Sequence, residues 1–109
     1  MKMAKKYEQQ FEPMPIGSVA EEIKRLRLNV ILHSCIYYEM DENIWDDITF
    51  DLKCKRLVAL LEEYPDVYSD RFDEFFKDWD GSSGFHFPHR DPWVYGKAAM
   101  LVKLHKERT

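Results

Sequence analysis

The residues best suited to chemistry lie between positions 37 and 51, where aromatic and acidic side chains surround a short polar segment. They are two adjacent tyrosines, a phenylalanine and three carboxylates: Tyr37, Tyr38, Asp41, Asp47, Phe50 and Asp51. Aromatic faces beside a few polar groups are typical of pockets that bind a planar ring, and carboxylates accept hydrogen bonds from hydroxyl groups. Such a cluster could hold a ring with an attached sugar. The alternative is plain packing, with the carboxylates acting as helix caps.

Two helices joined by the turn 41–46 are needed to position these residues. The first is expected to begin at Ser18, because Ser18 and Glu21 have the spacing of a capping box. Its apolar positions recur at helical spacing, at Val19, Ile23, Leu26, Val30 and Tyr37. The second is expected to be capped by Asp46 or Asp47 and to end at Pro65, with a buried face of Leu57, Leu60, Leu61 and Tyr64.

The C-terminal part is rich in aromatic residues. A third helix is predicted from about Ser69 to Trp79, with a stripe that favours core packing: Phe72, Phe75, Phe76 and Trp79. The Gly/Ser loop 80–84 should end it. Pro92 suits the first position of a last helix capped by Asp91, whose apolar side would be Val94, Ala98, Leu101, Val102 and His105.

The connector 85–92 and the residues after it concentrate aromatic rings with one cation: Phe85, Phe87, Arg90, Trp93 and Tyr95. This composition is common at binding surfaces. The alternative is that the rings close the core across the two-helix hairpin. Both interpretations place the connector near the hairpin.

Length and composition predict one all-α domain of about four helices, spanning residues 18–109. A hydrophobic content of 45% with 15% aromatic residues is well above that of a disordered chain. Residues 1–17 read as an arm, and its apolar residues suggest that part of it lies along the helices. They are Tyr7, Phe11, Met14 and Ile16.

The formal net charge of −4 argues against a general phosphate-binding surface, so direct DNA binding is not expected. The chain shows neither a signal peptide pattern nor an apolar stretch long enough to span a membrane. A cytoplasmic protein with reduced thiols is therefore expected, with Cys35 and Cys54 as small buried hydrophobic residues.

The sequence carries no enzyme signature. Ser82 and Ser83 lack a nucleophile elbow, and Cys35 is only two residues from His33, a spacing that points helical side chains apart. His86 and His89 with Asp91 have ligand types suited to a divalent metal, but packing within a rigid loop explains them without an ion. The expectation is no catalytic residue and no metal.

Residues 32–67 resemble the small N-terminal helical domain of the bacterial NAD-dependent DNA ligases. That family has the approximate pattern H-N-Y-x-Y-Y-x-x-D-x-P-x-I-x-D-x-E-Y-D-x-L-x-x-E-L-x-x-L-E-x-x-H-P-E. Laid on this chain without a gap, the pattern matches at His33, Tyr37, Tyr38, Asp41, Asp47, Asp51, Leu57, Leu60 and Pro65. Phe50 stands where the family has a tyrosine, and Asn43 where it has a proline.

In that family the domain binds the nicotinamide mononucleotide half of NAD. The resemblance implies aromatic and polar contacts from Tyr37 and Tyr38, and carboxylates from Asp47 and Asp51 near the ribose and the cationic ring. Phe50 would belong to the same site without the hydroxyl of the family's tyrosine. A ligase also needs an adenylation domain with a K-x-D-G motif. The string Lys77–Gly81 has one residue too many for that motif, so the chain is not expected to be a ligase by itself.

Two function classes follow. The first is a stand-alone, phage-encoded binding module that keeps a pocket for nicotinamide mononucleotide, NAD or a related nucleotide. The second is an acidic interaction protein or inhibitor, of the anti-defence or anti-CRISPR type, that binds a host protein. Retention of the two tyrosines and both carboxylates favours the first, whereas the phenylalanine at position 50 and the acidic balance favour the second.

Overall fold

The structure is a computed structural model that describes residues 18–108. This part of the chain forms three α-helices and one 3-10 turn, and it contains no strand: α2 (Val19–Met40), α3 (Asp47–Glu63), η2 (Asp73–Phe76) and α4 (Pro92–Arg108). The predicted all-α class is confirmed. The predicted arm 1–17 lies outside the described residues.

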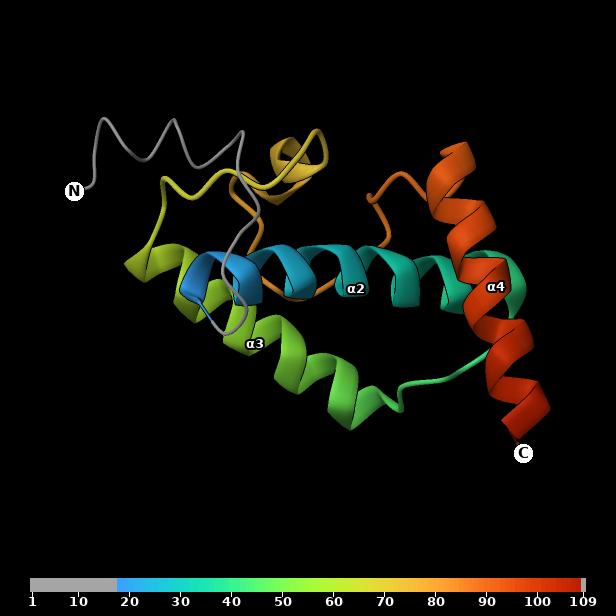
Figure 1. Cartoon of the computed structure of the whole chain (residues 1–109). Helices are drawn as coiled ribbons and strands as arrows, with labels where there is room; N and C mark the ends of the chain where they lie inside the picture. The colour runs from blue at the N-terminus through green and yellow to red at the C-terminus, as the bar shows by residue number, and fades with distance from the viewer. Residues whose placement is uncertain (1–17, 109) are drawn as a thin grey trace.

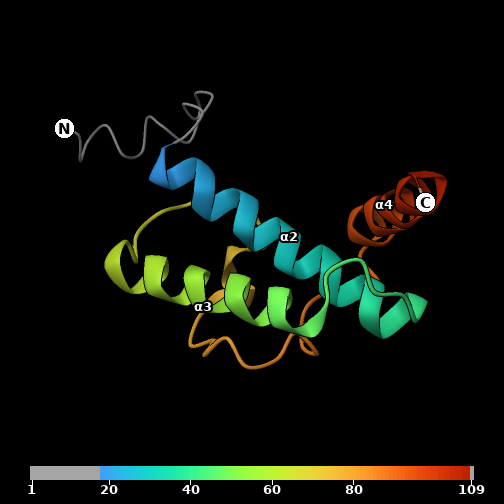
Figure 2. The same ribbon diagram turned by 90° about the horizontal axis from the view of Figure 1, so that it is seen from below.

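The long helix α2 is the centre of the fold, and the other helices pack against it. Helix α3 returns alongside α2 in the opposite direction, so the two form the predicted hairpin (Figure 1). Helix α4 crosses the C-terminal half of α2 steeply, and the view in Figure 2 looks almost along its axis. The segment that leads to α4 passes across the hairpin, so it can contribute side chains beside both of its helices.

The core is formed where these elements meet. Buried apolar side chains come from all three helices and from the aromatic segment, among them Ile23, Val30, Ile31, Cys35, Ile36, Cys54, Leu57, Phe72, Phe76, Phe87, Val94 and Ala98. The core role predicted for the aromatic stripe is confirmed for Phe72 and Phe76, whereas Phe75 and Trp79 are partly buried and pack against the core. Cys35 and Cys54 are buried free thiols, as expected. In contrast, Tyr37, predicted on the apolar face of α2, is 54% exposed.

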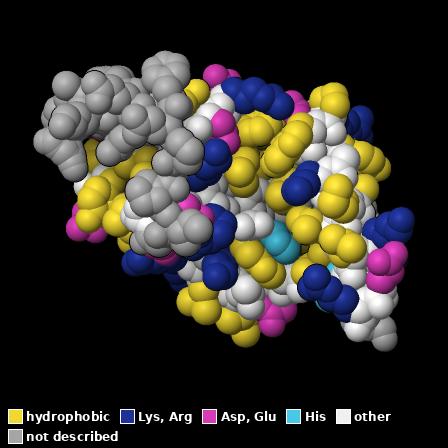
Figure 3. Space-filling model, viewed as in Figure 1, with side chains coloured by type: hydrophobic (Ala, Val, Ile, Leu, Met, Phe, Trp, Pro, Cys, Tyr) yellow, Lys and Arg dark blue, Asp and Glu magenta, His cyan; other side chains and the backbone are white. Residues whose placement is uncertain are grey.

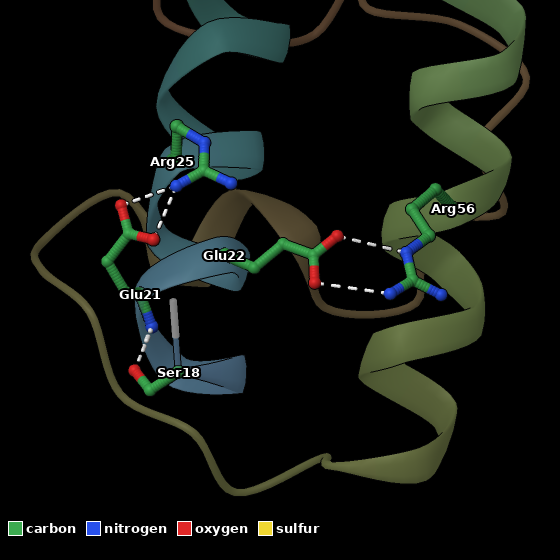
Figure 4. A network of polar contacts seen from close by, with 5 residues as sticks. All are labelled: Ser18, Glu21, Glu22, Arg25 and Arg56. Carbon is green, nitrogen blue, oxygen red and sulfur yellow. Dashed lines mark hydrogen bonds and ion pairs between the residues drawn. The ribbon is translucent and has the colours of Figure 1, made fainter. Parts of the chain in front are cut away.

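The open end of the hairpin is fixed by polar contacts (Figure 4). The hydroxyl of Ser18 accepts a hydrogen bond from the backbone N–H of Glu21 at 3.1 Å, which confirms the predicted cap. Glu22 on α2 accepts two hydrogen bonds from Arg56 on α3, at 3.0 and 3.1 Å. This bidentate pair holds the two helices together on the surface, where such pairs contribute at most ~1 kcal/mol.

The predicted third α-helix, from Ser69 to Trp79, is wrong. Only Asp73–Phe76 is helical, and it is a 3-10 turn. Two aspartates compete for the backbone donors that would start a helix: Asp70 accepts from the N–H of Phe72 at 2.9 Å, and Asp73 from that of Ser69 at 2.6 Å. Such side-chain bonds to nearby backbone favour turns over helices.

The start of α4 agrees with the prediction. Asp91 accepts hydrogen bonds from the backbone N–H groups of Trp93 and Val94, at 2.9 and 3.3 Å, and Pro92 is the first helical residue. Arg71 also pairs with Asp91 at 2.7 Å. This Arg71 partner holds the pKa of the Asp91 carboxyl below its usual range.

The loop before α4 packs against α3. Gly81 has a φ of +86°, and a Cβ there would lie 2.9 Å from the side chain of Val58, so both backbone shape and space call for glycine. Further along, Phe87 is buried whereas Phe85 is 73% exposed. The connector therefore both closes the core and presents aromatic surface. No helix formed by residues 18–108 is long and apolar enough to cross a membrane.

Candidate functional site

A cavity of about 200 Å³ lies between the C-terminal half of α2, the start of α3 and the segment 82–84. Its walls combine aromatic rings, hydroxyl groups and one carboxylate. The lining residues are His33, Ser34, Tyr37, Tyr38, Asn43, Ile44, Trp45, Asp47, Phe50, Ser82, Ser83 and Gly84.

Four of the five residues assigned by resemblance line this cavity: Tyr37, Tyr38, Asp47 and Phe50. The fifth, Asp51, does not. Its carboxylate pairs with Lys55 at 3.0 Å, one helical turn beyond Asp47. Of the two carboxylates that the resemblance implies, Asp47 therefore lines the same cavity as the tyrosines, and Asp51 does not.

Local helix signals explain why the Asp47 side chain is free to line the cavity. The cap of α3 is Asp46, which accepts a hydrogen bond from the backbone N–H of Thr49 at 2.7 Å. That bond lowers the pKa of the Asp46 carboxyl. Asp47 is the first residue inside the helix and is not needed as the cap. Phe50 follows three residues later on the same face, so both side chains reach the cavity.

The tyrosine pair forms an aromatic corner. The rings of Tyr37 and Tyr38 meet edge to face, with centroids 4.9 Å apart and planes at 85°. The Tyr38 ring also stacks on His89 at 5.4 Å and meets Phe85 edge-on at 5.4 Å. Tyr38 thus contacts three other rings, while 43% of it stays exposed. Part of Tyr38 is therefore open to solvent at the cavity that it lines.

A second ring pair also lines the cavity. His33 and Trp45 stack with centroids 3.8 Å apart and planes within 3° of parallel. Burial lowers the pKa of His33 from 6.5 to about 4. The imidazole is therefore neutral at neutral pH, and stacking on Trp45 fixes its orientation.

Two buried polar atoms beside the cavity have no hydrogen-bond partner: Nδ1 of His33 and Oγ of Ser34. An unsatisfied buried polar group costs about 1–3 kcal/mol. Gly84 lies directly over Ser34, because a Cβ at Gly84 would come within 2.8 Å of the Ser34 Cβ. A ligand group able to reach either atom would remove part of that cost.

The remaining lining residues carry different signals in the sequence. Ser34 is three and four residues before Tyr37 and Tyr38, so helical spacing alone places it on their face. Trp45 lies in the turn, and its position depends on the stack with His33. Residues 82–84 reach the cavity through tertiary packing, for which the sequence holds no local signal.

The other chemically suggestive side chains have structural partners. His86 and His89 each contact a backbone carbonyl, those of Phe75 at 2.8 Å and Gly84 at 2.9 Å. Within residues 18–108 no group of three or more histidine, cysteine or acidic residues is arranged to hold a metal ion. Burial raises the pKa of the Cys35 thiol to about 11 and that of Cys54 to about 12. Neither thiol is a reactive thiolate at neutral pH.

A second groove, lined in part by Arg25, Lys53 and Arg56, runs between α2 and α3. Its cations are engaged: Arg25 pairs with Glu21 and Arg56 with Glu22, and Lys53 lies 5.8 Å from the centre of the Trp45 ring. On the face shown in Figure 3, Lys and Arg side chains are scattered among hydrophobic and acidic ones. This face does not present a continuous basic patch.

Comparisons with family models, with curated proteins and with solved structures found no match. The resemblance to the ligase domain therefore rests on the residues of the segment 32–67 alone.

Proposed function

We propose that this chain is a non-catalytic binding module whose cavity holds the nicotinamide ring of nicotinamide mononucleotide or NAD. The observation that carries the proposal is the convergence of Tyr37, Tyr38, Asp47 and Phe50 on one cavity. The family pattern assigns these four residues to ligand contact, and they come from two different helices. Packing alone does not require the two exposed tyrosines to face the same hollow as a carboxylate.

The size of the cavity fits one part of the ligand. Pockets for drug-sized molecules measure ~300–1,000 Å³, whereas this one measures about 200 Å³. A single ring can enter it, and the ribose and phosphate would stay at its mouth. Asp51 lies one turn along α3 from Asp47, which is a suitable position for contact with the ribose hydroxyls.

The chemistry of the walls suits a cationic ring. The pyridinium of nicotinamide mononucleotide carries a positive charge, and aromatic faces attract cations through the ring quadrupole. Tyr37, Tyr38 and Phe50 supply such faces, and Asp47 supplies the opposite charge. Both effects act on the nicotinamide end of the nucleotide and not on its adenylate end.

Calorimetric titration of the whole chain tests this function. Nicotinamide mononucleotide and NAD should bind, whereas ADP-ribose and AMP, which lack the nicotinamide ring, should not. Asp47→Asn should weaken binding of the mononucleotide about 10- to 100-fold, the range expected for losing one charged contact. Glu62→Gln removes one charge from the exposed far end of α3 and should leave affinity unchanged. Equal binding of AMP, or no effect of Asp47→Asn, would contradict the proposal.

The second candidate is an interaction protein or inhibitor that binds a host protein. Phe85, 73% exposed beside Tyr38, supports it, because exposed aromatic side chains are common anchors at interfaces. The negative charge near the C-terminal end of α2 is partly neutralised, since Glu39 pairs with Arg90 and Glu42 with Lys106. A mimic of nucleic acid would need free carboxylates. Loss of partner binding in Phe85→Ala, without any nucleotide binding, would favour this candidate.

A further inference from the structure

The side of α4 turned away from the core carries an apolar stripe that stays exposed in the described part of the chain. Trp93, Met100 and Leu104 recur at intervals of seven and four residues, so they lie on one face of the helix. Each is between 41% and 50% exposed, whereas Val94 and Ala98 on the other side belong to the core. The stripe is roughly 16 Å long, as eleven helical steps require.

A hollow borders each end of this stripe. Near the start of α4, Trp93 shares a hollow of about 520 Å³ with Leu28 and Phe72. Near the end of α4, Leu104 shares one of about 230 Å³ with Ile44. Apolar side chains of a partner can enter such hollows, and a few anchors seated in this way carry most of the binding energy at many interfaces.

Gly96 keeps the middle of the stripe low. It lies one turn after Trp93, and a Cβ at this position would meet nothing within 4 Å. Packing inside residues 18–108 therefore does not require a glycine here, although glycine is unfavourable in a helix interior. A second helix can approach the α4 backbone closely at this point.

Cations flank the stripe. Lys97 and Arg108 lie along one side of it and Lys103 along the other, and all three are exposed. Within residues 18–108, Lys106 is the one cation of α4 that is held in an ion pair. Glu107 is the single carboxylate in the helix, so α4 is basic in a chain whose net charge is −4. On the face shown in Figure 3, where α4 lies in front of α2, hydrophobic side chains lie beside Lys and Arg side chains.

Three kinds of occupant fit this surface poorly. A second copy paired through its own α4 would bring lysines against lysines, which is unfavourable. A nucleic acid would meet an apolar stripe at the centre of the surface. Both a nucleic acid and an anionic membrane would approach a chain of net charge −4.

We propose that α4 docks an amphipathic helix of a partner protein, in which carboxylates flank the apolar side chains. The apolar side chains of that helix pack on the stripe and in the two hollows, and its carboxylates pair with the flanking cations. Trp93, Met100 and Leu104 do not line the cavity of the proposed function. Either proposal can therefore fail without the other.

Fluorescence anisotropy with designed peptides tests this surface on the whole chain. A labelled peptide of about 18 residues, long enough to form a helix, carries leucines at helical spacing with glutamates beside them. A matched peptide has lysines in place of the glutamates. The acidic peptide should bind at least ~5-fold more tightly than the basic one. Equal binding of the two peptides, or no binding of the acidic one, would overturn the proposal.

Matched variants locate the binding. Met100→Ala should weaken binding of the acidic peptide at least ~3-fold, whereas Leu52→Ala, which removes an exposed apolar side chain from α3, should not. Lys97→Glu should reduce the preference for the acidic peptide, whereas Lys77→Glu, the same change outside α4, should not. All four positions are exposed, so circular dichroism should show an unchanged fold. Equal effects of the α4 variants and their controls would overturn the proposal.

Two further measurements address the other occupants. Sedimentation velocity should show a monomer, and a dimer that Met100→Ala dissociates would mean that a second copy covers the stripe. Vesicles containing phosphatidylglycerol should not bind, and binding that Met100→Ala abolishes would make the stripe a membrane surface. Either result would overturn the proposal.

Discussion

Replacement of His33 by phenylalanine should change how the stability of the fold depends on pH. Phenylalanine keeps a planar ring against Trp45, but it removes the titrating nitrogen and the unpartnered Nδ1. At neutral pH the variant should be at least as stable as the wild type, because a buried polar atom without a partner is lost. The difference between the two proteins should appear on acidification.

The sign follows from the pKa of His33, which is about 4 in the folded chain against an ordinary value of 6.5. Well above pH 6.5 the imidazole is neutral in both the folded and the unfolded state, so His33 adds no pH dependence to the free energy of unfolding. Between 6.5 and 4 the unfolded chain takes up a proton that the folded chain does not, and the wild type loses stability. Below 4 both states are protonated and the loss is complete.

The magnitude can be calculated from these two values. From well above pH 6.5 to well below pH 4, the titration of His33 lowers the free energy of unfolding of the wild type by about 3 kcal/mol in all. Between about pH 7.5 and about pH 5, the wild type should lose about 2 kcal/mol through His33. Burial also lowers the pKa of His89, although the carbonyl of Gly84 and the carboxylate of Glu39 oppose this. That contribution is common to both proteins and cancels in the comparison.

Urea denaturation followed by circular dichroism at several pH values measures this difference. Near neutral pH the free energy of unfolding of His33→Phe should be equal to or higher than that of the wild type, and the difference between them should grow toward pH 5, with the variant more stable. Parallel pH profiles would refute the reasoning. They would mean that the buried position of His33 does not suppress its protonation.

Three further predictions concern the ligand, the cover of the cavity and DNA. Asp51→Ala should leave the affinity for free nicotinamide unchanged but lower the affinity for nicotinamide mononucleotide about 10-fold, because Asp51 lies beyond the ring cavity. Calorimetric titration with both ligands measures this, and an equal loss of affinity for the two would place Asp51 at the ring. In thermal denaturation, Gly84→Ala should destabilise the fold by about 1–3 kcal/mol, since the new Cβ would crowd Ser34. Gly96→Ala is the control: its Cβ would have nothing within 4 Å, so it should stabilise α4 slightly. Duplex DNA should not bind at about 0.15 M salt, since the sixteen lysines and arginines are outnumbered by twenty acidic residues and the described Lys and Arg side chains on the face in Figure 3 form no continuous patch. Micromolar binding in an anisotropy titration would contradict this.

The helix ends of this fold could be predicted from short sequence signals. Ser18 and Asp91 act as the predicted caps, and Asp46 is the cap from the two candidates Asp46 and Asp47, because capping depends on a side chain and a backbone donor only two or three residues away. The structure of the segment 69–79 could not be predicted in this way. Its aromatic spacing fits a helix, but Asp70 and Asp73 bind nearby backbone N–H groups, and Asp73 also pairs with Arg27 on α2 at 3.1 Å.

The candidate site was predictable only in part, because some of its contacts depend on tertiary packing and not on spacing along the chain. Tyr37, Tyr38, Asp47 and Phe50 lie on two helices whose facing sides follow from periodicity, so one turn brings them together. The pairing of Asp51 with Lys55 depends on side-chain conformation. The cover from Gly84 depends on a loop that crosses the hairpin, and its contact with Ser34 joins residues fifty positions apart. Spacing along the chain carries no information on such contacts.

The most direct test of the proposed site is an NMR titration of the isotope-labelled chain with nicotinamide mononucleotide. Amide signals of Ser34, Tyr38, Phe50 and Gly84 should shift together and saturate at one ligand per chain, with the Trp45 indole signal moving alongside them. Signals from the exposed C-terminal end of α4 should stay in place. Saturating shifts confined to other surfaces, or none at millimolar ligand, would contradict the assignment of this cavity as a nicotinamide site.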